Sequence, residues 1–170
     1  AYHEEIYRLT IEDGLTQIPN KRALVEYLDR EFARARRYGR PLTVLMMDID
    51  HFKNVNDEYG HLMGDYVLRE MAKLAKARSR HEEMFARYGG EEFCCVMPET
   101  DVAGGVVFAE NFRKLVEDHH FEFEGNRVRI TISIGVAQTD ETMTRAEAAV
   151  LVADENLYRA KRAGRNRVVS

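Results

Sequence analysis

Two adjacent glycines followed by two adjacent glutamates, residues 89–92, constrain the fold of this chain more than any other feature. They lie between two short apolar segments, residues 84–86 and 93–97. Because glycine adopts positive φ at little cost, paired glycines between strand-like segments predict a tight β-hairpin. Such a turn places two carboxylates at the exposed end of a sheet and lets a ligand approach bare backbone.

A second acidic site follows another apolar segment earlier in the chain. Residues 42–47 are almost continuously apolar, which is typical of a central strand covered on both faces. Asp48 and Asp50 come directly after it. Carboxylates at the ends of neighbouring strands suit a Mg²⁺ site for phosphoryl chemistry. The two acidic sites together predict an enzyme.

Length and charge exclude several classes of protein. With 170 residues, 45% of them hydrophobic, the chain suits one compact domain, and its net charge of −4 argues against a dedicated nucleic-acid binder. No segment approaches the roughly 20 apolar residues of a membrane span, and no signal peptide is visible.

The adjacent Cys94 and Cys95 should point to opposite faces of a strand, as reduced thiols. We therefore expect a cytoplasmic protein with no direct membrane insertion.

The remaining pattern alternates helices and strands around one sheet. Phe121 and Phe123 should pair through a turn at 124–127 with an alternating apolar strand at 128–136. This order predicts an α+β domain with a largely antiparallel sheet flanked by helices. The expected helices span 21–38, 64–77, 102–117 and 145–163, with a loop after the acidic site at 51–63 and a short terminal strand at 167–169.

Residues 1–12 form a separate segment that allows two interpretations. Tyr2, Ile6 and Leu9 recur at helical spacing. They indicate either a short helix packed on the domain or the end of a connecting helix from an upstream regulatory domain. We divide the chain accordingly, with residues 1–12 as the end of a connecting helix and 13–170 as the catalytic domain.

Five ordered segments extend over nearly the whole chain and resemble the GGDEF domains of diguanylate cyclases, in the GGEEF form of the signature. The segments are Asp13-Gly14-Leu15-Thr16 with Pro19-Asn20-Lys21-Arg22, Asp48 to Asp65, Gly89-Gly90-Glu91-Glu92-Phe93, Ile132 to Ala137, and Ala153 to Arg167. The resemblance implies a palm-type nucleotidyl cyclase fold with a central five-stranded sheet. It also implies condensation of two GTP into cyclic di-3′,5′-GMP with release of two pyrophosphates. A homodimer would be required, because each domain presents one nucleotide.

The resemblance assigns the acidic residues to metal binding and catalysis. Asp48, Glu91 and the backbone carbonyl of Ile49 are the expected ligands of two Mg²⁺ ions, for which Mn²⁺ could substitute. Glu92 is expected to support catalysis beside them. Taken alone, Asp48 could simply cap the next turn. Asp50 could either contact ligand or support the site structurally.

Two further groups of residues are expected to hold the nucleotide. Phosphate oxygens would be bound by the peptide groups of His51 and Phe52 and by Lys53, Lys161 and Arg165. Lys161 and Arg165 share a helix face, although a basic last turn is also favoured by the helix dipole.

Guanine would be bound by Asn56 and Asp65, since a carboxylate accepts from the N1–H and N2–H₂ donors of that base. Asp65 could alternatively be the N-cap of its helix.

A product-inhibition motif common in the family, Arg-x-x-Asp, is altered here. Arg80 is present, but Glu83 replaces the aspartate. Because this side chain is one methylene longer, we expect weak or absent feedback by cyclic di-GMP.

Two other functions compete with the cyclase. A binding module could retain GTP or cyclic di-GMP without turnover, but the intact set of site residues argues against it. A polymerase or nuclease palm would suit the metal pair, but the chain lacks a basic groove for a template. We therefore expect GTP, cyclic di-GMP, a second copy of the chain and an upstream sensor domain as partners, and no nucleic acid.

Overall fold

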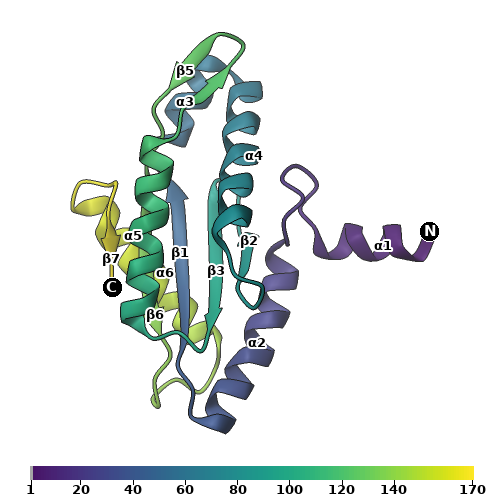
Figure 1. Ribbon diagram of the computed structural model, residues 1–170, viewed down its shortest axis with the longest axis vertical. Coiled ribbons are helices and arrows are strands. Elements are labelled where there is room, and N and C mark those ends of the chain that lie inside the picture. The colour runs from purple at the N-terminus through teal and green to yellow at the C-terminus, as the bar shows by residue number, and fades with distance from the viewer. Residues whose placement is uncertain (1) are drawn as a thin grey trace.

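A five-stranded sheet forms the centre of the protein in a computed structural model that describes residues 2–170 (Figure 1). The strand order is β2-β3-β1-β6-β7, and every pairing is antiparallel except the parallel contact between β6 and β7. The fold is therefore α+β around a mostly antiparallel sheet, as predicted. The strands are β1 Leu42–Ile49, β2 Met84–Arg87, β3 Glu92–Pro98, β6 Ile132–Gln138 and β7 Val168–Val169.

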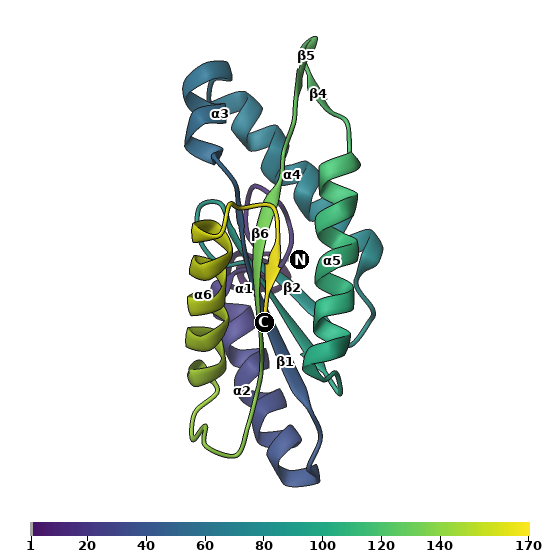
Figure 2. The same ribbon diagram turned by 90° about the vertical axis from the view of Figure 1, so that its left-hand side faces the viewer.

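Helices cover both faces of this sheet (Figure 2). On one face α2 and α6 pack against alternate residues of β1, including Val44 and Met46. On the other face α4 and α5 pack against Leu45 and Met47. The helices are α2 Lys21–Tyr38, α4 His61–Arg78, α5 Val102–Asp118 and α6 Glu147–Arg162.

The alternation of β3 confirms the expectation for the two cysteines. Cys94 belongs to the core on the α2 and α6 face, and Cys95 to the core on the α4 and α5 face. Both are fully buried free thiols, and burial raises the pKa of each well above its usual range. Neither is available for chemistry at the surface.

Local sequence accounts for the helix that precedes β1. Asn20 accepts a hydrogen bond from the amide of Ala23 as an N-cap, and Gly39 ends the helix in the left-handed conformation with φ of 64°. The predicted bounds of α2 are confirmed.

Two regions differ from the prediction. Residues expected as a loop form an eight-residue helix, α3 Phe52–Tyr59, and the next helix begins at His61 rather than Gly64. The alternating apolar run at 128–136 is broken into two strands, because the ribbon of β4 Phe121–Phe123 and β5 Asn126–Val128 is a separate sheet.

The first helix, α1 Tyr2–Ile11, lies to one side of the domain (Figure 1). None of its residues is buried, and Tyr2 and Leu9 are about three-quarters exposed. It is therefore not packed into the body of the domain. Within residues 2–170, no helix combines the length and apolarity needed to cross a membrane.

Candidate active site at the end of the central strands

The two acidic sites of the sequence meet at one end of the sheet. In the antiparallel register of β1 and β3, Asp48 lies opposite Glu92. Partners in such a pair direct their side chains to the same face, here the α6 face. The backbone amide of Ile49 donates to the carbonyl of Glu91 at 3.3 Å. The structure thus brings together Asp48, Ile49 and both glutamates.

Burial and mutual repulsion make this cluster unfavourable for negative charge. Burial raises the pKa of Asp48, the hydrogen bond and charge of Lys161 oppose that shift, and the charges of Glu91 and Asp50 add to it. The pKa of Glu92 is raised first by burial and then by Asp48 and Asp154. Such a cluster is stabilised by a bound cation.

The cation present beside Asp48 is the ammonium group of Lys161. Its Nζ lies 2.5 Å from Asp48 Oδ2, and the two side chains are 32% and 10% exposed. The sequence predicted that Lys161 would contact phosphate and would share a helix face with Arg165. The shared face was wrong, because α6 ends at Arg162 and Arg165 lies in the left-handed turn beyond it. The structure places Lys161 on α6, where its ammonium contacts the Asp48 carboxylate at the end of β1.

The donor set fits Mg²⁺ rather than a metal held wholly by side chains. Among residues 2–170, no three His, Cys, Asp or Glu side chains are arranged as a metal cluster. Two carboxylates and a backbone carbonyl suit Mg²⁺, which retains waters and substrate phosphates in its coordination shell.

The glycine turn does not have the left-handed backbone that we expected. Gly89 and Gly90 are absent from the residues with positive φ, so the predicted left-handed glycines were wrong. A Cβ on Gly89 would lie 2.7 Å from Glu92 Oε1. The end of the Glu92 side chain therefore lies over Gly89, and a side chain at position 89 would displace that carboxylate.

Arg87 holds this turn, and our sequence analysis did not identify it. Its guanidinium donates to the carbonyls of Gly89 and Gly90 and to the carboxylate of Asp13, at 2.8–3.2 Å. Burial raises the pKa of Asp13, but bonds from Thr16 and Arg87 outweigh it and lower the pKa overall. The position of Arg87 directly before the turn could have indicated that it binds the turn, but its partner Asp13 lies far away in the sequence.

The residues predicted for phosphate binding begin α3. His51 is the N-cap residue, in the left-handed conformation with φ of 55°, and makes no capping bond with its side chain. α3 begins three residues after β1 ends at Ile49, so its first amides follow the strand end that carries Asp48, and Lys53 is exposed in its first turn. The Phe52 ring packs against the core.

The residues predicted to bind guanine lie on two helices joined at Gly60. Asn56 belongs to α3 and Asp65 to α4, and both are half-buried. A Cβ on Gly64 would be 1.9 Å from Asn56 Oδ1, so the Asn56 amide packs directly over that glycine. Asp65 is the fifth residue of α4, so the alternative role as an N-cap was wrong.

The altered inhibition motif lies in the loop between α4 and β2. Arg80 and Glu83 line a cavity of about 610 Å³. The Glu83 carboxylate accepts from the backbone amide of Arg80 at 2.8 Å.

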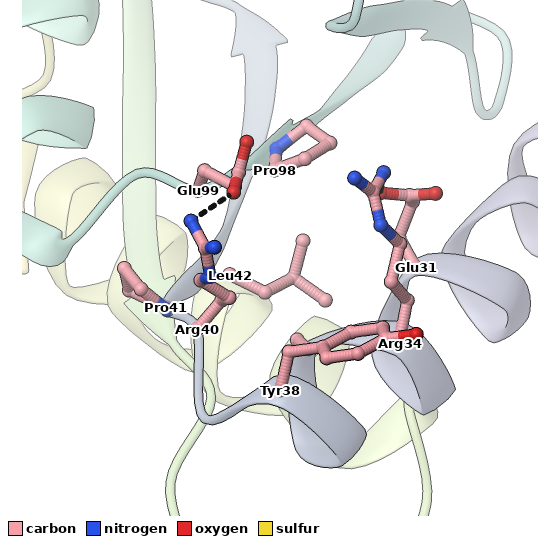
Figure 3. A pocket seen from close by; sticks show the side chains of 9 residues that line it. Glu31, Arg34, Tyr38, Arg40, Pro41, Leu42, Pro98 and Glu99 are labelled. Carbon is pink, nitrogen blue, oxygen red and sulfur yellow. Dashed lines mark hydrogen bonds and ion pairs between the residues drawn. The ribbon is translucent and has the colours of Figure 1, made fainter.

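A further cavity, of about 300 Å³, lies at the opposite end of β1, near Leu42 (Figure 3). Its charged groups are paired within the chain: Arg40 with Glu99 at 2.6 Å and Arg34 with Glu31 at 3.5 Å. It does not belong to the acidic site.

Comparisons with known proteins agree with this geometry. The family model described as "Diguanylate cyclase, GGDEF domain" matches residues 10–167. The chain is 41% identical to diguanylate cyclase DgcP of Pseudomonas aeruginosa and 37% identical to diguanylate cyclase A of Treponema denticola, over 99% and 98% of its own length. It spans only 25% and 46% of those proteins. The GGDEF domain of DgcB from Caulobacter crescentus, solved in complex with c-di-GMP, superimposes with a TM-score of 0.91 at 34% identity, over 94% of this chain and 92% of that one.

Proposed function

Because the chain belongs to the GGDEF family of diguanylate cyclase domains, we propose that it condenses two GTP into cyclic di-3′,5′-GMP and releases two pyrophosphates. The observation that carries this proposal is the register that sets Asp48 opposite Glu92, with Glu91 beside Ile49. In the same proposal, residues 13–170 are the catalytic domain and residues 1–12 end a connecting helix from an upstream sensor. The site operates in the cytoplasm, where GTP is available.

Asp48, Glu91 and the carbonyl of Ile49 would hold Mg²⁺, two ions per site, with Mn²⁺ as a substitute. When bound, the metal would favour the ionised form of the attacking hydroxyl and neutralise charge on the triphosphate. Glu92 would support catalysis beside these ligands, with its carboxylate lying over Gly89. Burial raises the pKa of Asp48 and of Glu92, so metal binding should weaken as the pH falls and these carboxylates take up protons.

The triphosphate would lie between the start of α3 and the end of α6. The amides of His51 and Phe52 and the ammonium of Lys53 would bind its oxygens from one side. Lys161 and Arg165 would bind from the other side, Lys161 after leaving Asp48. These contacts fix the α-phosphate near the carboxylates without altering its chemistry.

Guanine would bind between α3 and α4. Asp65 accepts from N1–H and N2–H₂, while the Asn56 amide can both donate and accept. An aspartate at this position favours guanine over adenine.

The reaction needs two copies of the chain, because one site presents one nucleotide. Each 3′-hydroxyl oxygen forms a bond to the α-phosphorus of the facing nucleotide, and the bond from that phosphorus to pyrophosphate breaks. Two such events close the ring. Because Glu83 replaces the aspartate of the inhibition motif, cyclic di-GMP would inhibit this reaction weakly or not at all.

The test is incubation of concentrated protein with GTP and Mg²⁺, followed by chromatography with mass detection. We expect one cyclic di-GMP for every two pyrophosphates, and no product from Glu91→Ala. If neither the chain nor an artificially dimerised form of it makes product while GTP still binds, the chain is a nucleotide-sensing module instead.

A further inference from the structure

The turn that follows α6 is held in an unfavourable backbone conformation. Arg165 and Asn166 both lie in the left-handed region, with φ of 65° and 46°. Residues that carry a Cβ rarely adopt this conformation, and two in succession need support from their surroundings. Such strain points to a function when it lies beside a binding site.

Asp50 supports the backbone of this turn. Its side chain is buried, and its Oδ2 accepts from the backbone amide of Asn166 at 3.0 Å and from the hydroxyl of Thr131 at 2.8 Å. Its other oxygen, Oδ1, accepts from the hydroxyl of Ser133 at 2.7 Å. A fully bonded buried carboxylate holds its partners in fixed positions.

The side chain of Asn166 fixes the turn from the opposite side. Its amide oxygen accepts from Arg113 at 2.9 Å, and its amide nitrogen donates to Glu117 at 2.5 Å, both on α5. The turn is therefore held between β1 and α5 rather than by its own sequence.

We propose that Asp50 is a positioning residue that, through the main chain of Asn166, directs Arg165 at the terminal phosphate of the nucleotide. Asp50 follows the metal-binding Asp48 by two residues, so it fixes the Arg165 turn relative to that carboxylate. This inference rests on the proposed function, in which Arg165 binds phosphate. Its consequence is selection of a nucleoside triphosphate over a diphosphate.

The test compares binding of 3′-deoxy-GTP, which lacks the attacking hydroxyl, with binding of GDP by calorimetry in Mg²⁺. Asp50→Ala should bind 3′-deoxy-GTP about tenfold more weakly while its affinity for GDP changes little, since only the triphosphate reaches Arg165. Asp50→Asn should restore most of the loss, because the amide oxygen can still accept from Asn166. Ser133→Ala is the matched control. It removes a bond to the same carboxylate but leaves the contact with the turn, so it should bind both nucleotides as the wild type does.

Asn166→Gly provides a second variant should Asp50→Ala fail to fold. Glycine adopts the left-handed conformation freely, so this change removes the anchors to α5 without new strain. It should also weaken binding of the triphosphate selectively. The inference is overturned if the folded variants keep the wild-type preference for triphosphate, or if Ser133→Ala loses it equally. A wild-type chain with no such preference would overturn the proposed phosphate site itself.

Discussion

Replacing Lys161 by methionine should increase the affinity of the nucleotide-free protein for divalent cations. The Lys161 ammonium lies 2.5 Å from Asp48 Oδ2 and so would compete with a metal for that carboxylate in the proposed site. Two unit charges about 4 Å apart interact by about 4 kcal/mol at an effective dielectric constant of about 20. Because the Lys161 side chain is 32% exposed, water offsets much of this attraction, and about 1–2 kcal/mol should remain. This corresponds to roughly five- to thirtyfold tighter metal binding.

The assay is titration with Mn²⁺, followed by electron paramagnetic resonance, in the absence of nucleotide. Arg165→Gln is the control, because it removes a positive charge from the exposed end of the same segment and leaves the Lys161–Asp48 contact in place. Lys161→Met should bind metal more tightly and nucleotide more weakly. Unchanged metal affinity, or an equal gain in Arg165→Gln, would refute the competition between Lys161 and the metal.

Three further predictions follow from the site. Glu92→Gln should raise the free energy of unfolding at pH 7 while lowering activity. The pKa of Glu92 is raised above its ordinary value of 4.5, so the folded protein is destabilised once the pH rises above that raised pKa and Glu92 ionises. Urea denaturation should therefore show that glutamine stabilises the protein at pH 7 and no longer does so at a pH where Glu92 is protonated. Gly64→Ala should raise KM for GTP several-fold and weaken discrimination against ATP, because its Cβ would displace Asn56; an unchanged KM would show that Asn56 does not contact the base. Cyclic di-GMP should bind weakly in calorimetry, and tight stoichiometric binding that disappears in Arg80→Ala would show that Glu83 replaces the aspartate fully.

The sequence located most of the fold because its elements carry strong local signals. The bounds of α2 follow from the cap at Asn20 and the left-handed Gly39. α3 was missed although Phe52, Val55 and Tyr59 recur at helical spacing, because the segment is only eight residues long and only Val55 is buried in it. Its helical form depends on packing against α4.

The placement of the candidate site residues was predictable where they are neighbours in sequence, and less so where their contacts are distant. The position of the hairpin was correct, yet its glycines do not have the positive φ that their sequence led us to expect. The bond between Arg87 and Asp13 joins residues far apart in the chain and appears only once the sheet is formed. The bonds of Asp50 to β6 and to the turn after α6 became visible for the same reason.

In the proposed reaction each chain provides half of the site, and a dilution series distinguishes this arrangement from catalysis by a single chain. The initial rate of cyclic di-GMP formation per chain should be measured with saturating GTP and Mg²⁺ over a wide range of protein concentration. We expect this rate to rise steeply with concentration, because two weakly associating chains would have to meet. A rate per chain that stays constant down to the most dilute sample, where the chain is monomeric by light scattering, would contradict it.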